Sequence, residues 1–151
     1  MGATHFSGPV ISGTLGYGDT LGPNQGNAVL DQAVAVSYDA TLVQSSTFYI
    51  PAGSRILNFT ADVLTAYNSA TSATLSVGIT AGGTEYVASV NVKAATGRIA
   101  ITFTAAQLAA MNGTSIVGAA AAIAGTVVAT VTSVGQPTAG YVVVNCIYVQ
   151  Q

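Results

Sequence analysis

Alternating apolar and polar positions predict β-strands over most of the chain from residue 33 onward. The clearest run is TLSVGIT at 74–80, in which Leu75, Val77 and Ile79 share one face. The run EYVASVNVK at 85–93 alternates in the same way and places four apolar residues together: Tyr86, Ala88, Val90 and Val92. Two glycines, Gly82 and Gly83, lie between the runs and suit a tight turn. Residues 73–93 are therefore predicted to form a β-hairpin.

Other runs rich in β-branched and aromatic residues predict further strands. They lie at 33–38, 42–50, 55–67, 97–103, 126–134 and 140–149. Pro51 to Gly53 predicts a turn, and the loop GQPTAG, with Pro137 and Gly140, predicts a hairpin between the last two strands. In 97–103 the alternation places Ile99, Ile101 and Phe103 inward. Eight or nine short strands with little helix predict an all-β sandwich with jelly-roll-like or other Greek-key connections.

One segment departs from the β pattern. In TAAQLAAMNG, Thr104 and Gln107 have the spacing of a capping box, helix formers follow, and Gly113 is placed to end the helix. One short helix is therefore predicted near 105–111.

Residues 1–32 show neither the apolar period of two that is typical of strands nor the period of 3.6 that is typical of helices. Seven glycines and two prolines interrupt this stretch, so it demands no regular element. The composition fits an extended arm that becomes ordered only on a partner, and it fits a disordered leader equally. The predicted organisation is an N-terminal arm over 1–32 and a β-sandwich body over 33–151.

The chain is very poor in charge. Three basic and five acidic residues make it 5% charged, against about 25% in an ordinary soluble domain. A protein of this mass exposes roughly 7,000 Å², which leaves about one charge per 900 Å². We expect such a surface to be covered by copies of the chain or by a partner. The alternative is that Ser, Thr, Asn, Gln and Gly solvate it.

The stretch from Tyr141 to Val144 is apolar on both faces of its predicted strand. One side fits the core. The other fits a subunit interface, although a strand in the middle of a sandwich gives the same pattern. Together with aromatic residues of the arm, the expected interface residues are Phe6, Tyr17, Tyr141 and Val143.

Residues able to support chemistry are scarce. His5 is the sole histidine and lies in the arm, while Cys146 is the sole cysteine, so we expect neither a catalytic site nor a metal or cofactor site. Three basic residues are too few to neutralise phosphates, which argues against nucleic acid. The most apolar uncharged window, Ile116 to Thr132, is made mostly of Ala, Gly, Thr and Val without basic flanks, and the N-terminus lacks the pattern of an export signal. We therefore expect no membrane segment and synthesis in the cytoplasm.

Three stretches together resemble small virion proteins of tailed bacteriophages. They are THFSGPVISG at 4–13, YIPAGSRILNFTADVLTAYNSATSATLSVGI at 49–79, and VVATVTSVGQPTAGYVVVNCIYVQ at 127–150. The resemblance is to capsid decoration, or cement, proteins and related structural proteins. These are patterns of strand and turn, and no active-site residues come with them.

The resemblance implies a β-rich subunit, commonly a homotrimer, on the outer surface of the capsid. Its implied partners are its own copies and the major capsid protein, and its implied role is to stabilise the shell. Even for such proteins the charge of this chain is low. The alternative from another class is a tail-fibre tip or carbohydrate-binding module, which the absence of Trp and the scarcity of acids disfavour.

Overall fold

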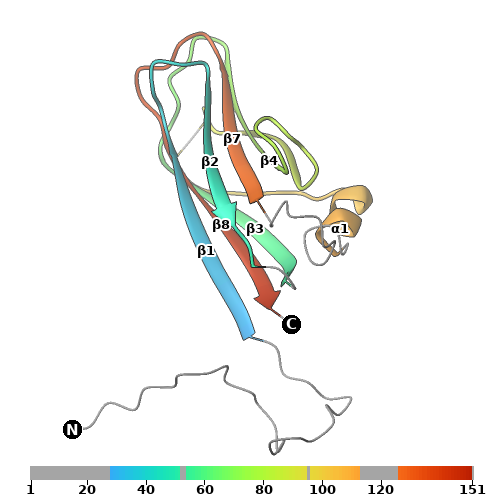
Figure 1. Ribbon diagram of the computed structural model, residues 1–151. Coiled ribbons are helices and arrows are strands. Elements are labelled where there is room, and N and C mark those ends of the chain that lie inside the picture. Colours follow the sequence, from blue (N-terminus) through green and yellow to red (C-terminus); the bar gives the residue numbers. More distant parts are fainter. Residues whose placement is uncertain (1–27, 52–53, 95, 113–125, 151) are drawn as a thin grey trace, which may run out of the picture.

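Runs of β-branched residues form long strands, and these strands make up most of the molecule (Figure 1). The computed structural model describes residues 28–51, 54–94, 96–112 and 126–150. Within them the strands are β1 (Ala28–Ser37), β2 (Val43–Tyr49), β3 (Ser54–Thr65), β4 (Ser72–Gly78), β5 (Val87–Asn91), β6 (Gly97–Ile99), β7 (Thr126–Val134) and β8 (Tyr141–Gln150), and the helix is α1 (Ala105–Asn112).

The strands form two antiparallel sheets of four. Sheet A has the order β1-β8-β3-β6 and sheet B the order β2-β7-β4-β5. Strand β1 pairs with β8, β2 with β7, β3 with β6 and β4 with β5, as in one long hairpin rolled over itself. This is the strand order of a jelly roll. The all-β sandwich predicted from the sequence is confirmed.

The core lies between the two sheets. Its largest fully buried side chains come from both layers and include Phe48 and Leu75 of sheet B and Ile56 and Phe59 of sheet A. The rings of Phe48 and Phe59 meet edge to face across the layers, with their centroids 6.3 Å apart. Burying one such side chain stabilises the fold by about 1.5–3 kcal/mol, so these inward faces hold the sheets together.

The predicted hairpin over 73–93 is confirmed, but the predicted orientation of some of its side chains was wrong. Leu75 pairs with Val90 and Val77 with Val87, so β5 has one residue more than β4 over this interval. Ser89 is in the left-handed region, with a φ of 50°, which is typical of a β-bulge. The extra residue reverses the alternation, so Val87 is buried and Ala88 is exposed, opposite to the expectation. Ile79, expected to share a face with Leu75 and Val77, lies beyond the end of β4 and is exposed, whereas those two residues are buried.

The predicted hairpin between the last two strands was wrong. Strand β7 lies in sheet B and β8 in sheet A, so residues 135–140 cross from one layer to the other. Asn68 holds this crossing, because its Oδ1 accepts hydrogen bonds from the N–H groups of Thr138 (2.8 Å) and Ala139 (3.0 Å). A loop with Pro and Gly can join neighbouring strands of one sheet, as a hairpin, or strands of two different sheets, as an arch. Only the pairing partners of the two strands distinguish these cases.

The short helix is confirmed, together with its cap. The backbone N–H of Thr104 donates to Oε1 of Gln107 (2.9 Å), and the N–H of Gln107 donates to Oγ1 of Thr104 (3.3 Å). Helix α1 ends at Asn112, and Gly113, expected to end it, lies outside the described residues. Within the described residues, no helix has the length and apolar character needed to cross a membrane.

The body begins earlier than the sequence pattern indicated. Strand β1 starts at Ala28, so residues 28–32, assigned to the arm, form the first half of that strand. Phe6 and Tyr17, two of the four expected interface residues, lie outside the described residues.

Candidate interaction surface

Strand β8 has one face in the core and one face on the outside of sheet A. Its inward residues Val142, Val144 and Cys146 are fully buried between the sheets. Tyr141, which is 37% exposed, and Val143, which is half-buried, alternate with them and point outward. The two expected interface residues of β8 therefore share one surface, which we call the outer face of sheet A.

Two β-bulges in β3 enlarge the apolar part of this face. The pairing of β3 with β8 shifts between Ile56 and Asn58 and again between Val63 and Thr65. The extra residues are Leu57 and Leu64, which are 40% and 60% exposed. Sequence reasoning missed both leucines. The available signal was that Ile56 and Phe59 are both strongly apolar but three positions apart, which breaks a period of two.

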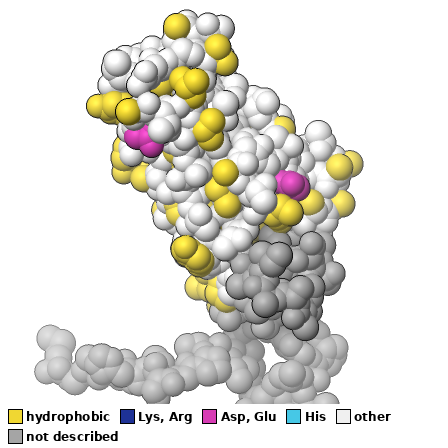
Figure 2. All heavy atoms as spheres, turned by 45° about the horizontal axis from the view of Figure 1, so that its top comes forward, with side chains coloured by type: hydrophobic (Ala, Val, Ile, Leu, Met, Phe, Trp, Pro, Cys, Tyr) yellow, Lys and Arg dark blue, Asp and Glu magenta, His cyan; other side chains and the backbone are white. Residues whose placement is uncertain are grey.

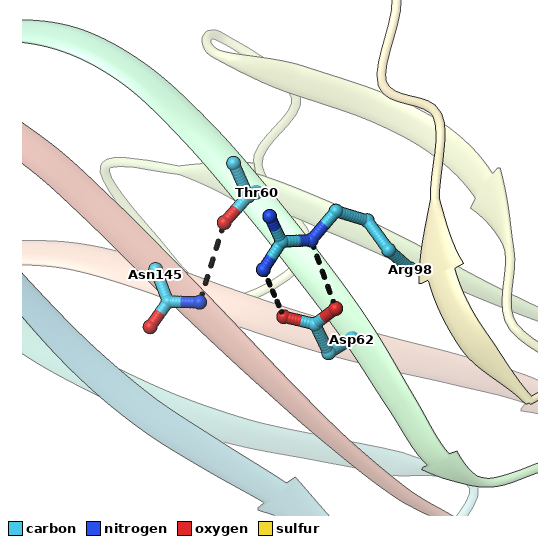
Figure 3. A network of polar contacts seen from close by, with 4 residues as sticks. All are labelled: Thr60, Asp62, Arg98 and Asn145. Atoms are coloured by element: carbon cyan, nitrogen blue, oxygen red, sulfur yellow. Dashed lines mark hydrogen bonds and ion pairs between the residues drawn. The ribbon is translucent and has the colours of Figure 1, made fainter.

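An ion pair joins β3 to the border strand β6 on the outer face (Figure 3). Nε of Arg98 on β6 donates to Oδ1 of Asp62 on β3, and Nη2 donates to Oδ2, both at 2.9 Å. The hydrogen bonds from Arg98 hold the pKa of Asp62 below its ordinary value. Beside it, Nδ2 of Asn145 on β8 donates to Oγ1 of Thr60 at 3.2 Å. These polar groups thus bind one another across neighbouring strands.

The charges of the strands all lie in sheet A. Its strands contain Asp31, Arg55, Asp62 and Arg98, whose formal charges cancel. The strands of sheet B contain no charged residue at all. The outer face of sheet A therefore combines exposed apolar side chains with no net charge, which suits contact with another protein surface.

The outer face of sheet B has a different chemistry. By strand register its outward positions are mostly hydroxyl residues: Ser45, Thr47, Ser72, Thr74, Ser76, Thr126, Thr130 and Thr132. The loop after β4 covers part of this face, because the N–H of Gly82 donates to Oγ1 of Thr130 (2.9 Å). In Figure 2 apolar side chains are scattered among uncharged polar ones and acidic groups are sparse. Hydroxyl groups therefore take over much of the solvation that charges usually provide.

Groups able to support catalysis do not come together in the described part of the chain. It contains no cluster of three or more His, Cys, Asp or Glu residues that could hold a metal ion. Cys146 is buried in the core, and burial raises the pKa of its thiol to about 12, so the thiol is protonated at neutral pH. His5 lies outside the described residues.

Comparison of the chain with family models, with curated proteins and with solved structures found no match. The function is therefore argued from the two outer faces and from the charge of the chain. Both faces have exposed apolar side chains, such as Leu57 and Leu64 on sheet A and Val43 and Tyr49 on sheet B, and the face of sheet A also contains the β8 residues expected from the sequence.

Proposed function

We propose that the chain is a structural virion protein that decorates the outer surface of a tailed-phage capsid and stabilises the shell as a homotrimer. The observation that carries this proposal is the outer face of sheet A. There, exposed Leu57, Leu64 and Tyr141 share a face with polar groups that bind one another. A protein partner that covers the pair of Asp62 and Arg98 leaves no unpaired charge at that point.

The energy of such a contact is large enough without salt bridges. If each subunit covers about 800 Å² of apolar area, the transfer term at about 25 cal/mol per Å² is of order 20 kcal/mol. Association itself costs about 4–15 kcal/mol, so a surplus remains. On a repeating lattice several copies held together multiply modest contacts further. The arm predicted from the sequence, with Phe6 and Tyr17, is proposed to contact a neighbouring subunit or the shell, and its residues 1–27 lie outside the described residues.

Tyr141→Asp tests the face in solution. The wild-type chain is expected as a trimer of about 45 kDa, three times its 15.0 kDa. The variant is expected to dissociate, because an unpaired charge would be buried in the contact. Tyr141 is preferred to Val143, since Val143 lies opposite Asp62 and a second carboxylate there would also disturb the single subunit.

The matched control is Thr74→Asp on the outer face of sheet B, which is expected to stay trimeric. Native mass spectrometry measures both variants. A trimer that survives Tyr141→Asp would remove the sheet A face from the contact. A wild-type chain that stays monomeric at high concentration and does not co-sediment with phage capsids would contradict the proposed function.

One observation favours a second candidate, a carbohydrate-binding module. Tyr49 is 72% exposed on β2, among the hydroxyl residues of sheet B, and an exposed ring beside hydroxyl groups can stack on a sugar. Jelly rolls also form lectin domains. A glycan array with the wild type and Tyr49→Ala separates the two functions, because only the second predicts sugar binding that the substitution abolishes.

A further inference from the structure

Within the described residues, strand β1 is a long edge strand without the usual protection. It forms one border of sheet A and pairs along its whole length with β8, without a bulge (Figure 1). Its ten residues include no proline and no lysine, and Asp31 is its sole charge. Natural proteins normally shorten, bend or charge such edges, because the free backbone groups would otherwise pair with another strand.

The register shows which backbone groups of β1 face away from the sheet. The N–H of Tyr38, just after the strand, donates to the carbonyl oxygen of Gly140 (2.9 Å), so Tyr38 faces β8. Backbone groups alternate in direction along a strand, and the unbroken register continues this alternation through β1. The residues whose N–H and C=O point away from β8 are therefore Val29, Asp31, Ala33, Ala35 and Ser37.

We propose that this edge pairs with β1 of a second copy of the chain, antiparallel, across a two-fold axis at Ala33. The five free residues are centred on Ala33, so Ala33 meets Ala33, Asp31 meets Ala35, and Val29 meets Ser37. Each of the five residue pairs exchanges two hydrogen bonds, which satisfies every free group of the edge. A shift of the partner by two residues in either direction loses at least one of the five pairs.

The side chains of the edge favour a second copy as the partner. In this register the two Asp31 residues lie four residue steps apart along the strands, about 14 Å, beyond the Debye length of about 8 Å at physiological salt. Asp31 thus meets a neutral residue. The central outward side chains, Ala33 and Ala35, are small and allow close approach. The pairing would join the two A sheets into one sheet of eight strands with a continuous outer face.

The self-pairing can be tested separately from the trimer. The wild-type chain should form a dimer of about 30 kDa, or a hexamer of about 90 kDa if the proposed trimer forms as well. A dimer alone would support the β1 contact and contradict the trimer. A trimer alone, or a monomer, would overturn the β1 contact. Native mass spectrometry separates all four masses.

A charge pair at the two-fold axis tests the register. Ala33→Lys places two like charges directly opposite each other, and Ala33→Glu does the same with the other sign. Each variant alone should weaken self-association by about tenfold or more, because the two like-charged side chains start from Cα atoms only about 5.5 Å apart and share one face of the sheet. An equimolar mixture of the two variants should restore pairing as a mixed dimer with one chain of each kind. Mixing without recovery would overturn the proposed register.

A backbone variant gives an independent readout. Ala33→Pro removes an N–H that faces away from β8, and proline is tolerated at such edge positions. The matched control is Ser45→Pro on β2, the edge strand of sheet B. Ser45 has the same orientation as Tyr49, whose N–H faces away from β7 and donates to Oε1 of Gln32 (3.0 Å). Both variants should remain folded by circular dichroism, and only Ala33→Pro should lose self-pairing. Equal self-association of Ala33→Pro and Ser45→Pro would overturn the proposal. If Ala33→Pro unfolds, the variants Ala33→Lys and Ala33→Glu decide whether the β1 edges pair.

Discussion

At the scale of single residues, the position of Gly140 is set by the ring of Tyr67. A Cβ at this glycine would lie 2.5 Å from the ring carbons, and Tyr67 is fully buried with its hydroxyl donating to the carbonyl oxygen of Val36 (3.1 Å). The ring therefore has no room to move. Close approach of backbone to side chain is what requires glycine here.

Gly140→Ala is expected to lower the free energy of unfolding by about 3 kcal/mol, because the added carbon overpacks the core. The control is Gly82→Ala, which has a positive φ but no atom within 4 Å of the added Cβ, and should cost only about 1 kcal/mol of backbone strain. Denaturant unfolding measures both. Equal losses would show that the contact with Tyr67 does not decide the choice of glycine.

Buried tyrosines predict how stability depends on pH. Burial raises the pKa of Tyr67 and of Tyr86 from the ordinary 10.0 to about 12. In the unfolded chain these phenols ionise near pH 10, while in the folded chain they remain neutral to about pH 12. The stabilisation is therefore fully present below pH 10 and is lost as the pH rises from 10 to 12.

We expect the free energy of unfolding to fall over this interval, measured by denaturant titration at successive pH values. Tyr67→Phe should flatten the fall, since one of the three buried groups with a raised pKa, Tyr67, Tyr86 and Cys146, can no longer ionise. An unchanged pH dependence in Tyr67→Phe would contradict the assignment.

At the scale of elements, helix α1 depends on its N-terminal cap. Thr104→Ala removes the side-chain acceptor for the N–H of Gln107 and should cost about 1 kcal/mol of stability. Thr102→Ala, at an exposed position before the helix, is the matched control and should change stability little. Denaturant unfolding with both variants checks this. A loss as large in Thr102→Ala would show that the cap is not the cause.

Strand positions and the helix were predictable because they depend on local patterns, such as the alternation in 74–80 and the pair Thr104 and Gln107. Three features could not be predicted from local patterns. The bulge at Ser89 and the two bulges of β3 depend on pairing with distant strands, so local alternation could not place Ala88, Leu57 or Leu64. The arch between β7 and β8 likewise depends on the distant strands with which β7 and β8 pair.

The candidate surface was predictable only in part. Apolar residues on both faces of β8 pointed to an outward apolar surface, and Tyr141 and Val143 share it. The pair of Asp62 and Arg98 was not foreseen, because 36 positions separate the two residues in the chain. Only the pairing of β3 with β6 brings them together.

At the scale of the whole molecule, the distribution of charge decides how the protein should respond to salt. The strands of sheet B have no charge, and those of sheet A have no net charge. Association through either outer face is therefore apolar in origin, and pairing at the β1 edge uses uncharged backbone groups, so both should be insensitive to screening. Between about 0.05 and 0.5 M NaCl, we expect the dissociation constant of the homo-oligomer to change by less than about threefold. Sedimentation measures this, and dissociation at high salt would indicate a contact driven by charge.

The pairing of Ala28 with Gln150 has a consequence for synthesis. Strand β8 lies between β1 and β3, so the first strand of the body has no neighbour in its sheet until the last one has been made. Until β8 has been synthesised, the backbone groups of β1 have no partner strand in sheet A. Folding of this layer can therefore be completed only once β8 has left the ribosome, and until then β1 is the segment most in need of protection from premature aggregation.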